Sequence, residues 1–329
     1  MTFASITALL QAAILFGTVI LYGSAGEVIT EKSGNLNLGV PGIMYLGGIA
    51  GLAGAFIYES STANPVPMLC LLIALGCAFA ASVLGALIFG VLTISLRANQ
   101  NVAGLTLTIF SAGLANFFGG SLNTMAGGVG QISVAATSAV FRANVPFLRD
   151  LPVVGNLLFS YGFMVYLAPI VAIAIGWFLS RTAVGLNLRA VGENPATADA
   201  AGINVTKYKY LATCIGGGIT GLGGLYYAMD YIKGTWANDG GIERAGWLAV
   251  ALVIFASWRP RRAIWGAYLF GLLFWAFLYI PGLTRSTQKL FEMLPYAVTI
   301  AVLIFVSLRR RRENQPPAGL GLSYFREER

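Results

Sequence analysis

Long apolar segments separated by short polar ones run through the whole chain. Segments whose interior carries no charge and whose length suffices to span a bilayer occur at about nine places, between eight and ten with uncertain boundaries. They are residues 4–25, 37–58, 66–96, 100–120, 160–180, 209–229, 245–258, 262–280 and 292–308. The pattern predicts an all-α polytopic membrane protein.

Two segments depart from a simple spanning helix. The apolar run 66–96 is too long for a helix perpendicular to the bilayer, so we expect a tilted or broken one. Residues 26–40 form either a loop or a dip within the membrane. Pro41, between Gly39 and Gly42, predicts at least one broken helix near the N-terminus. Interrupted helices often build transport sites near the bilayer midplane.

The longest polar and basic interruption between apolar runs covers residues 181–209. Asn194 suits a helix N-cap, and Pro195 suits the first helical position, where no amide hydrogen is needed. Gly202 can adopt the left-handed conformation that ends many helices. The sequence therefore predicts a capped helix, within a cytoplasmic loop, that is presented to a soluble partner.

Composition agrees with a membrane protein. Of the 329 residues 57% are hydrophobic and only 10% are charged, too few charges for most soluble domains. The net charge of +8 comes from basic residues in short loops, so it indicates membrane orientation and no nucleic acid. The absence of histidine excludes histidine acid–base chemistry, and we expect no cofactor and no metal site. Residues 1–312 form the predicted membrane domain, and 313–329 form a predicted disordered tail.

Basic residues also predict the orientation of the chain. They gather at 181–209, at 259–262 and at 309–312, which successive spans place on one side, the cytoplasm. The C-terminus is then cytoplasmic. The opposite side receives 121–159, where the segment from Asp150 to Phe159 predicts a helix lying at the outer surface.

Polar side chains near or within the spans are candidates for a solute pathway. Unpaired amides at membrane depth cost free energy, so they should face protein, water or substrate. An alternative for Asn99 and its neighbours is a solvated turn, and threonines can bond to their own helix backbone. The candidate pathway residues are Asn35, Asn37, Gly39, Pro41, Asn99, Gln100, Thr106 and Asn116.

Two absences limit how transport is powered. The chain contains no GxxxxGK[ST] phosphate loop, so an ATP-driven process would need the ATPase on another chain. The carboxylates lie at the edges of predicted spans, and none lies at mid-span, as a proton relay would require. These residues are Glu27, Glu31, Glu59, Asp230 and Glu243.

Two stretches resemble a known family. Residues 26–44, GEVITEKSGNLNLGVPGIM, are similar to the N-terminal signature of the nucleoside and simple-sugar permeases of ABC importers. Residues 189–205, RAVGENPATADAAGINV, followed by 246–260, GWLAVALVIFASWRP, resemble their coupling loop and a later span. The resemblance covers most of residues 20–280 and extends to the wider ribose and branched-chain amino-acid permease family. Pro41 departs from it, because that branch usually has an acidic residue there.

The resemblance implies a permease subunit in the inner membrane with several partners. These are cytosolic ABC ATPase subunits, a second permease subunit, identical or paralogous, and an extracytoplasmic solute-binding lipoprotein. ATP would be bound by the partner ATPases, and this chain would not be an enzyme. The implied ATPase-coupling residues are Gly192, Glu193, Asn194, Pro195, Ala198, Asp199, Ala201 and Gly202. Glu193 and Asp199 would pair with basic residues of the ATPase, and Ala198 and Ala201 would fill a groove on it.

Other function classes stay open from the sequence alone. A secondary transporter or a channel for a small polar solute would use 181–209 only as a connector, and its uptake would continue without ATP. An intramembrane enzyme has little chemistry available, with no histidine and no carboxylate pair at mid-span.

Overall fold

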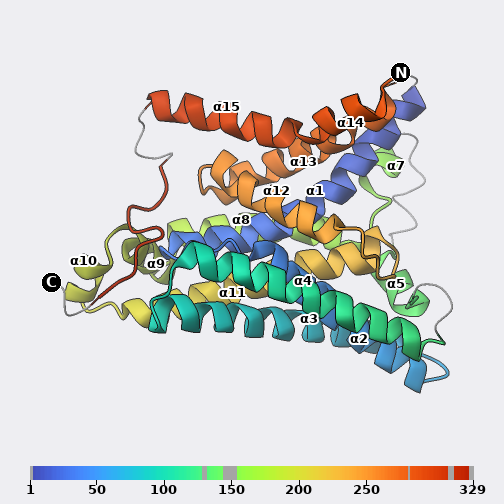
Figure 1. The fold of residues 1–329 in the computed structure, drawn as a ribbon, viewed down its shortest axis with the longest axis horizontal. Helices are drawn as coiled ribbons and strands as arrows, with labels where there is room; N and C mark the ends of the chain where they lie inside the picture. The colour runs from blue at the N-terminus through green and yellow to red at the C-terminus, as the bar shows by residue number, and fades with distance from the viewer. Residues whose placement is uncertain (1–2, 128–131, 144–153, 281, 310–314, 326–329) are drawn as a thin grey trace.

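The computed structural model describes residues 3–127, 132–143, 154–280, 282–309 and 315–325, and these are helical in long stretches (Figure 1). One long helix falls in each predicted apolar segment, which bears out an all-α polytopic membrane protein. These helices are α1 (Phe3–Lys32), α2 (Val40–Ser61), α3 (Pro67–Gly90), α4 (Gln100–Met125), α8 (Phe163–Arg181), α11 (Val205–Tyr226), α12 (Gly241–Phe255), α13 (Pro260–Trp275) and α15 (Leu294–Arg309).

Shorter helices connect the long ones. They are α5 (Ala135–Phe141), α7 (Val154–Leu158), α9 (Ala183–Glu193), α10 (Pro195–Ala200) and α14 (Arg285–Glu292). Three end turns wind differently: the π-helices η1 (Val91–Ser95) and η2 (Tyr227–Tyr231), and the 3-10 helix η3 (Ala276–Tyr279). The predicted surface helix over 150–159 appears in part as α7, and its residues 150–153 lie outside the described ones.

Six helices in the described residues are long and apolar enough to cross a membrane. A seventh candidate is α14 with α15, which are bent by 43° at their junction. The apolar run 66–96 forms one candidate span of 29 residues, Pro67–Ser95, that ends in η1. Length and composition alone therefore identify six or seven spans, fewer than the predicted nine.

The core forms where α11 packs against α1, α2 and α3. Glycines on the facing surfaces permit this close approach. A Cβ on Gly47 would lie 2.2 Å from the carbonyl oxygen of Gly221, and one on Gly26 would lie 2.2 Å from that of Gly216. Small residues are a general means of helix packing in lipid, where apolar side chains gain little by leaving the solvent.

The two ends of the bundle carry different segments. Figure 1 shows α5, α7 and the N-terminal end of the chain at one end of the long axis, and α9, α10 and the C-terminal end at the other. At the former end the segments after α4 and after α11 are joined, since the amide of Val134 donates to the carbonyl of Gly234 at 2.9 Å. The hydroxyl of Ser138 likewise donates to the carbonyl of Met229 at 2.8 Å.

The predicted broken helix near the N-terminus is a turn between two helices. Residues 33–39 connect α1 to α2, and Pro41 lies in the first turn of α2. Proline interrupts no hydrogen bond there, because the first amides of a helix have no partner within it.

The C-terminal tail has a defined path where the structure describes it. The amide of Gly319 donates to the carbonyl of Gly192 at 2.9 Å, and that of Gly321 donates to the carbonyl of Gly34 at 3.3 Å. Residues 315–325 thus lie against the end of the bundle, in contrast to the disorder predicted from composition. Backbone groups make these contacts, and the side chains of Leu320 and Tyr324 pack against buried apolar residues of the bundle.

Candidate functional site

The helix α10 has the local structure that its sequence predicts. The side chain of Asn194 accepts a hydrogen bond from the amide of Thr197 at 3.0 Å, and Pro195 occupies the first turn. Gly202 follows with φ +84°, and a Cβ at that position would meet no atom within 4 Å. The prediction of a capped helix from Asn194 to Gly202 is confirmed.

The side chains of α10 divide between an inner and an outer face. Ala198 is only 3% exposed and packs against Val191 and Val205. Its methyl group therefore holds α10 against the bundle. It does not point outward to fill a groove on an ATPase, as was predicted from the sequence. The outer face runs along the whole of α10, where Ala196, Thr197 and Ala200 are exposed, and continues into the flanking residues. The exposed flanking residues are Glu193, Asn194, Ala201 and Gly202.

The acidic residues of the coupling segment have partners within the chain. Asp199 accepts a hydrogen bond from the hydroxyl of Tyr324 at 2.9 Å. A carboxylate oxygen of Glu193 accepts from the amide of Ala318 at 3.4 Å. Both bonds come from the C-terminal tail, which was not predicted to contact this segment.

A backbone contact joins the coupling segment to the interior. A Cβ on Gly192 would lie 2.2 Å from the carbonyl oxygen of Lys32 and 3.1 Å from the amide nitrogen of Gly34. The same glycine receives the tail through Gly319. The end of α9 is therefore in direct backbone contact with the turn between α1 and α2.

That turn is an interior cluster of polar side chains. Asn35 is fully buried, and its amide group donates to the hydroxyls of Thr93 and Thr213, each at 3.2 Å. Asn37 is 1% exposed; its amide donates to Glu27 at 3.1 Å, and its carbonyl oxygen accepts from the amide of Gly39 at 2.9 Å. The two asparagines thus connect the turn to α1, to the end of α3 and to α11.

Two carboxylates lie deeper than predicted. Helix α1 continues to Lys32, so Glu27 and Glu31 are inside it, and both are buried. The indole of Trp258, between α12 and α13, donates to Glu31. One oxygen of Glu27 is buried and has no hydrogen-bond partner among the residues that the structure describes. Both still lie within the last two turns of α1, so the prediction that they lie near a span edge agrees with the structure. The predicted span 4–25 ended too early, because it stopped at the first charge.

The four polar candidates on α4 lie in different surroundings. Gln100 is buried and accepts a hydrogen bond from the amide of Leu36 at 2.6 Å, so it belongs to the interior cluster. Asn99 is exposed and caps α4 by accepting from the amides of Asn101 and Val102.

Further along α4 the candidates separate again. Thr106 is exposed on the outside of the bundle. Asn116 is half-buried, and its side-chain oxygen has no hydrogen-bond partner in the described residues. Unsatisfied buried oxygens are expected where a polar ligand or water is to be bound.

Gly39 and Pro41 occupy the start of α2. Gly39 is the N-cap of the helix, and Pro41 is buried against α12, where a Cβ on Gly246 would lie 2.6 Å from the Cα of Pro41. Pro41 thus makes a packing contact. The structure brings together Asn35, Asn37, Gly39 and Gln100, with Pro41 alongside, and leaves Asn99, Thr106 and Asn116 outside that cluster.

Comparison with known proteins identifies what this arrangement belongs to. The family model of the branched-chain amino acid transport system permease component matches residues 8–303. A protein of Haloferax volcanii named "Putative glucose ABC transporter permease protein" is 35% identical, and the match covers 99% of each chain.

Two bacterial relatives are named for nucleosides. The nucleoside ABC transporter permease protein of Lactococcus lactis is 31% identical over 88% of this chain and 89% of its own. The guanosine ABC transporter permease protein of Bacillus subtilis is 31% identical over 98% of this chain and 97% of its own.

Proposed function

This chain belongs to the permease family of the branched-chain amino acid transport systems and is a membrane-spanning subunit of an ABC importer, and we propose that it carries nucleosides or simple sugars inward. The observation that carries the proposal is the full-length similarity to relatives named for guanosine and glucose. As a permease subunit it is not itself catalytic. Neutral, hydroxyl-rich solutes also fit the buried asparagines and glutamine near the turn between α1 and α2.

We propose a topology of nine spans with the C-terminus in the cytoplasm. Helices α11 and α12 would be the two spans beyond the seven identified by length and composition. Helix α12 has only 15 residues, and α11 carries Lys207 and Lys209 near its start and is rich in glycine. Both pack on α1 and α2 in the interior, so neither needs a strongly apolar surface. An odd number of spans then places the N-terminus outside.

The proposed partners follow from the family and from the outer face of α10. A cytosolic ATPase subunit would bind there, beside the C-terminal tail, in an importer with a second permease subunit and an extracytoplasmic solute-binding lipoprotein. ATP would be held by the ATPase. Closure of the ATPases would move α10 and α9, and the contact of Gly192 with Gly34 would pass this movement to the buried polar cluster. Such coupling requires only that closure favours one pathway conformation by a few kcal/mol.

The solute would meet two groups of polar residues on its path. We propose that Asn116 offers its unpartnered oxygen in the outer half, and that Asn35, Asn37 and Gln100 form the inner constriction. Rearrangement of the cluster between its own hydrogen bonds and those to solute would open and close that constriction.

The identity of the substrate is tested with the proposed solute-binding lipoprotein. Its melting temperature should rise with nucleosides or with sugars, and the same compounds should compete for ATP-dependent uptake into vesicles that hold the complete transporter. Stabilisation by amino acids alone would refute the proposed substrate class. Uptake that continues after ATP is removed would refute the ATP-driven mechanism.

The docking site is tested by separating the two faces of α10. Ala201→Trp places a bulky group on the exposed face, so we expect loss of ATPase binding in a pull-down while the chain still inserts and folds. Ala126→Trp is the control, because it changes an exposed alanine just after α4, at the opposite end. Equal ATPase binding by Ala201→Trp and the parent would exclude this face as the docking site.

A further inference from the structure

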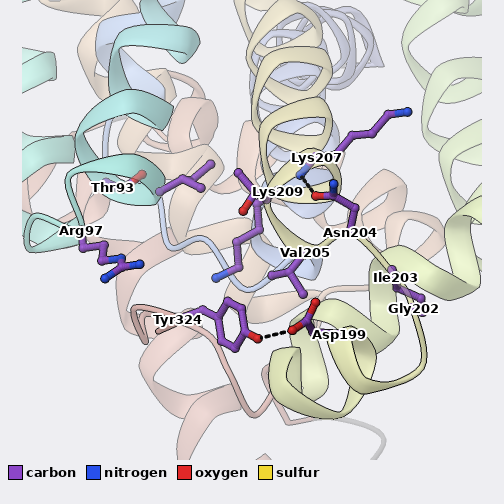
Figure 2. Close-up of a pocket in the computed structure, with 12 residues that line it drawn as sticks. Thr93, Arg97, Asp199, Gly202, Ile203, Asn204, Val205, Lys207, Lys209 and Tyr324 are labelled. Atoms are coloured by element: carbon purple, nitrogen blue, oxygen red, sulfur yellow. Dashed lines mark hydrogen bonds between the residues drawn. The ribbon is translucent and has the colours of Figure 1, made fainter. Parts of the chain in front are cut away.

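A cavity of about 610 Å³ lies beside α10 and reaches the buried polar cluster only at Thr93 (Figure 2). Its walls come from η1 and the residues after it, from α10, from the start of α11 and from the C-terminal tail. The residues that the argument uses are Arg97, Asp199, Val205, Thr206, Lys209 and Tyr324.

Lys209 is the central observation. It is only 4% exposed, and in the described part of the chain its amine has no recorded hydrogen bond or ion pair. Figure 2 shows the amine directed into the cavity, toward Tyr324. Burial of an unpaired ammonium group is costly, so an anion in the cavity would offset a penalty that the protein alone leaves in place.

The start of α11 provides a second group of donors. This helix has 22 residues, and the side chain of Asn204 accepts from the amide of Lys207 at 2.9 Å. The amides of Val205 and Thr206 precede the first bonds within the helix, and both residues line the cavity. A helix N-terminus favours a negative charge placed at its amides.

The charges around the cavity favour an anion. Arg97 lies opposite Lys209 and holds its guanidinium 4.4 Å from the ring centre of Phe325. Asp199 is the acidic residue among the described lining residues, and it accepts a hydrogen bond from Tyr324. Lys207 also lines the cavity, but Figure 2 shows its side chain pointing away from Lys209.

We propose that this cavity binds a phosphate group, with Lys209 as its main ligand and Arg97 and the first amides of α11 as further donors. The phosphate would come either from the headgroup of an anionic phospholipid or from a soluble phosphate ester. An exposed apolar side chain beside the lining residue Arg97 suits the acyl chains of a lipid, because Leu96 is 68% exposed. Lipid headgroups are commonly held by basic pockets of this kind on the cytoplasmic side.

The test compares two lysines of the same helix. Lys209→Met removes the buried amine, and Lys207→Met removes an exposed one of equal charge two residues away. Full-length chains would be reconstituted in nanodiscs of phosphatidylcholine with or without phosphatidylglycerol, and retained lipid would be measured by native mass spectrometry. We expect Lys209→Met to retain about tenfold less phosphatidylglycerol than the parent, the effect of one charge-assisted interaction, with Lys207→Met unchanged.

A second arm separates the two sources of phosphate. In detergent without anionic lipid, inorganic phosphate or glycerol 3-phosphate should raise the melting temperature of the parent and not of Lys209→Met, with sodium chloride at equal ionic strength as the control. A response in the lipid arm alone identifies a headgroup, and a response to soluble phosphate identifies a phosphate ester.

Three results would overturn the proposal. One is equal behaviour of Lys209→Met and the parent in both arms. Another is an equal loss in Lys207→Met, which would indicate diffuse surface charge. The last is a melting temperature that differs between Lys209→Met and the parent only when the ATPase is added. That result would show that Lys209 pairs with an acidic side chain of the ATPase.

Discussion

The turn between α1 and α2 and the segment around α10 are both short, polar and rich in asparagine and glycine, but they use these residues differently. In the turn, Asn35 and Asn37 are buried and bond to side chains of other helices. Around α10, Asn194 is exposed and bonds to an amide three residues ahead. A buried amide must find partners wherever the fold provides them, whereas an exposed one serves its own helix. The first kind assembles tertiary structure, and the second ends a helix.

The strongest test of this comparison breaks the contact between the two regions. Gly192→Ala would place a Cβ 2.2 Å from the carbonyl oxygen of Lys32, where backbone must shift. We expect a loss of about 3 kcal/mol of stability and the loss of transport, as for other overpacked sites. Gly76→Ala is the control, since a Cβ there meets nothing within 4 Å. Thermal unfolding of the purified chain and uptake by the complete transporter measure the two effects, and a mild outcome like that of Gly76→Ala would show that the contact does not couple the regions.

Removing a buried amide should cost somewhat less. Asn37→Ala deprives Glu27 and the amide of Gly39 of a partner in the interior, so we expect about 2 kcal/mol of destabilisation. The exposed Asn101→Ala should change stability little. Chemical denaturation in detergent would compare them, and equal stabilities would contradict the assembling role of the turn.

Removing the exposed N-cap of α10 should destabilise the chain less than removing a buried amide, but it should weaken coupling to the ATPase more. Asn194→Ala loses the bond to Thr197, at a cost of about 1 kcal/mol, and lets the start of α10 fray. Thr284→Ala removes the equivalent cap of α14 and serves as control. We expect stimulation of ATPase activity by loaded receptor to fall in Asn194→Ala and not in Thr284→Ala. A parallel fall in both would point to general instability.

The smallest effect concerns the tail. Tyr324→Phe removes one hydrogen bond to Asp199, and we expect about 0.5–1 kcal/mol together with faster proteolysis of the tail. Tyr58→Phe, which loses a bond to the amide of Val66 near the other end, is the matched change. Limited proteolysis followed by mass spectrometry would detect it, and an unchanged cleavage pattern would show that the hydroxyl does not hold the tail.

Local rules predicted the parts of this molecule that depend on neighbours in sequence. The capping of α10 by Asn194 and Pro195 follows from spacing alone, and the long helices follow from apolar runs. The interior cluster could not be derived in the same way, because the bond from Asn35 to Thr213 joins residues 178 positions apart. The only indication in the sequence was the presence of side-chain amides next to a membrane span. These amides identified candidate residues but gave no information about their hydrogen-bond partners.

The misplaced features share a physical cause. Ending a span at its first charge excluded Glu27 and Glu31, although protein around them, and not lipid, sets the cost of burying them. From the sequence, Ala198 could be any exposed alanine of a helix. Only the folded structure shows that it packs against Val191 and Val205. The tail has no apolar periodicity, so its sequence does not indicate the backbone contacts or the packing of Leu320 and Tyr324 that hold it.

The docked tail bears on how this protein is handled in the laboratory. A purification tag or fluorescent protein joined after Phe325 begins close to Asp199 and α10, and would occupy the space proposed for the ATPase subunit. Labels are better attached at the start of α1, at the opposite end of the bundle in Figure 1. Low activity of a C-terminally labelled preparation should therefore be checked against one labelled at the N-terminus before the transporter is judged inactive.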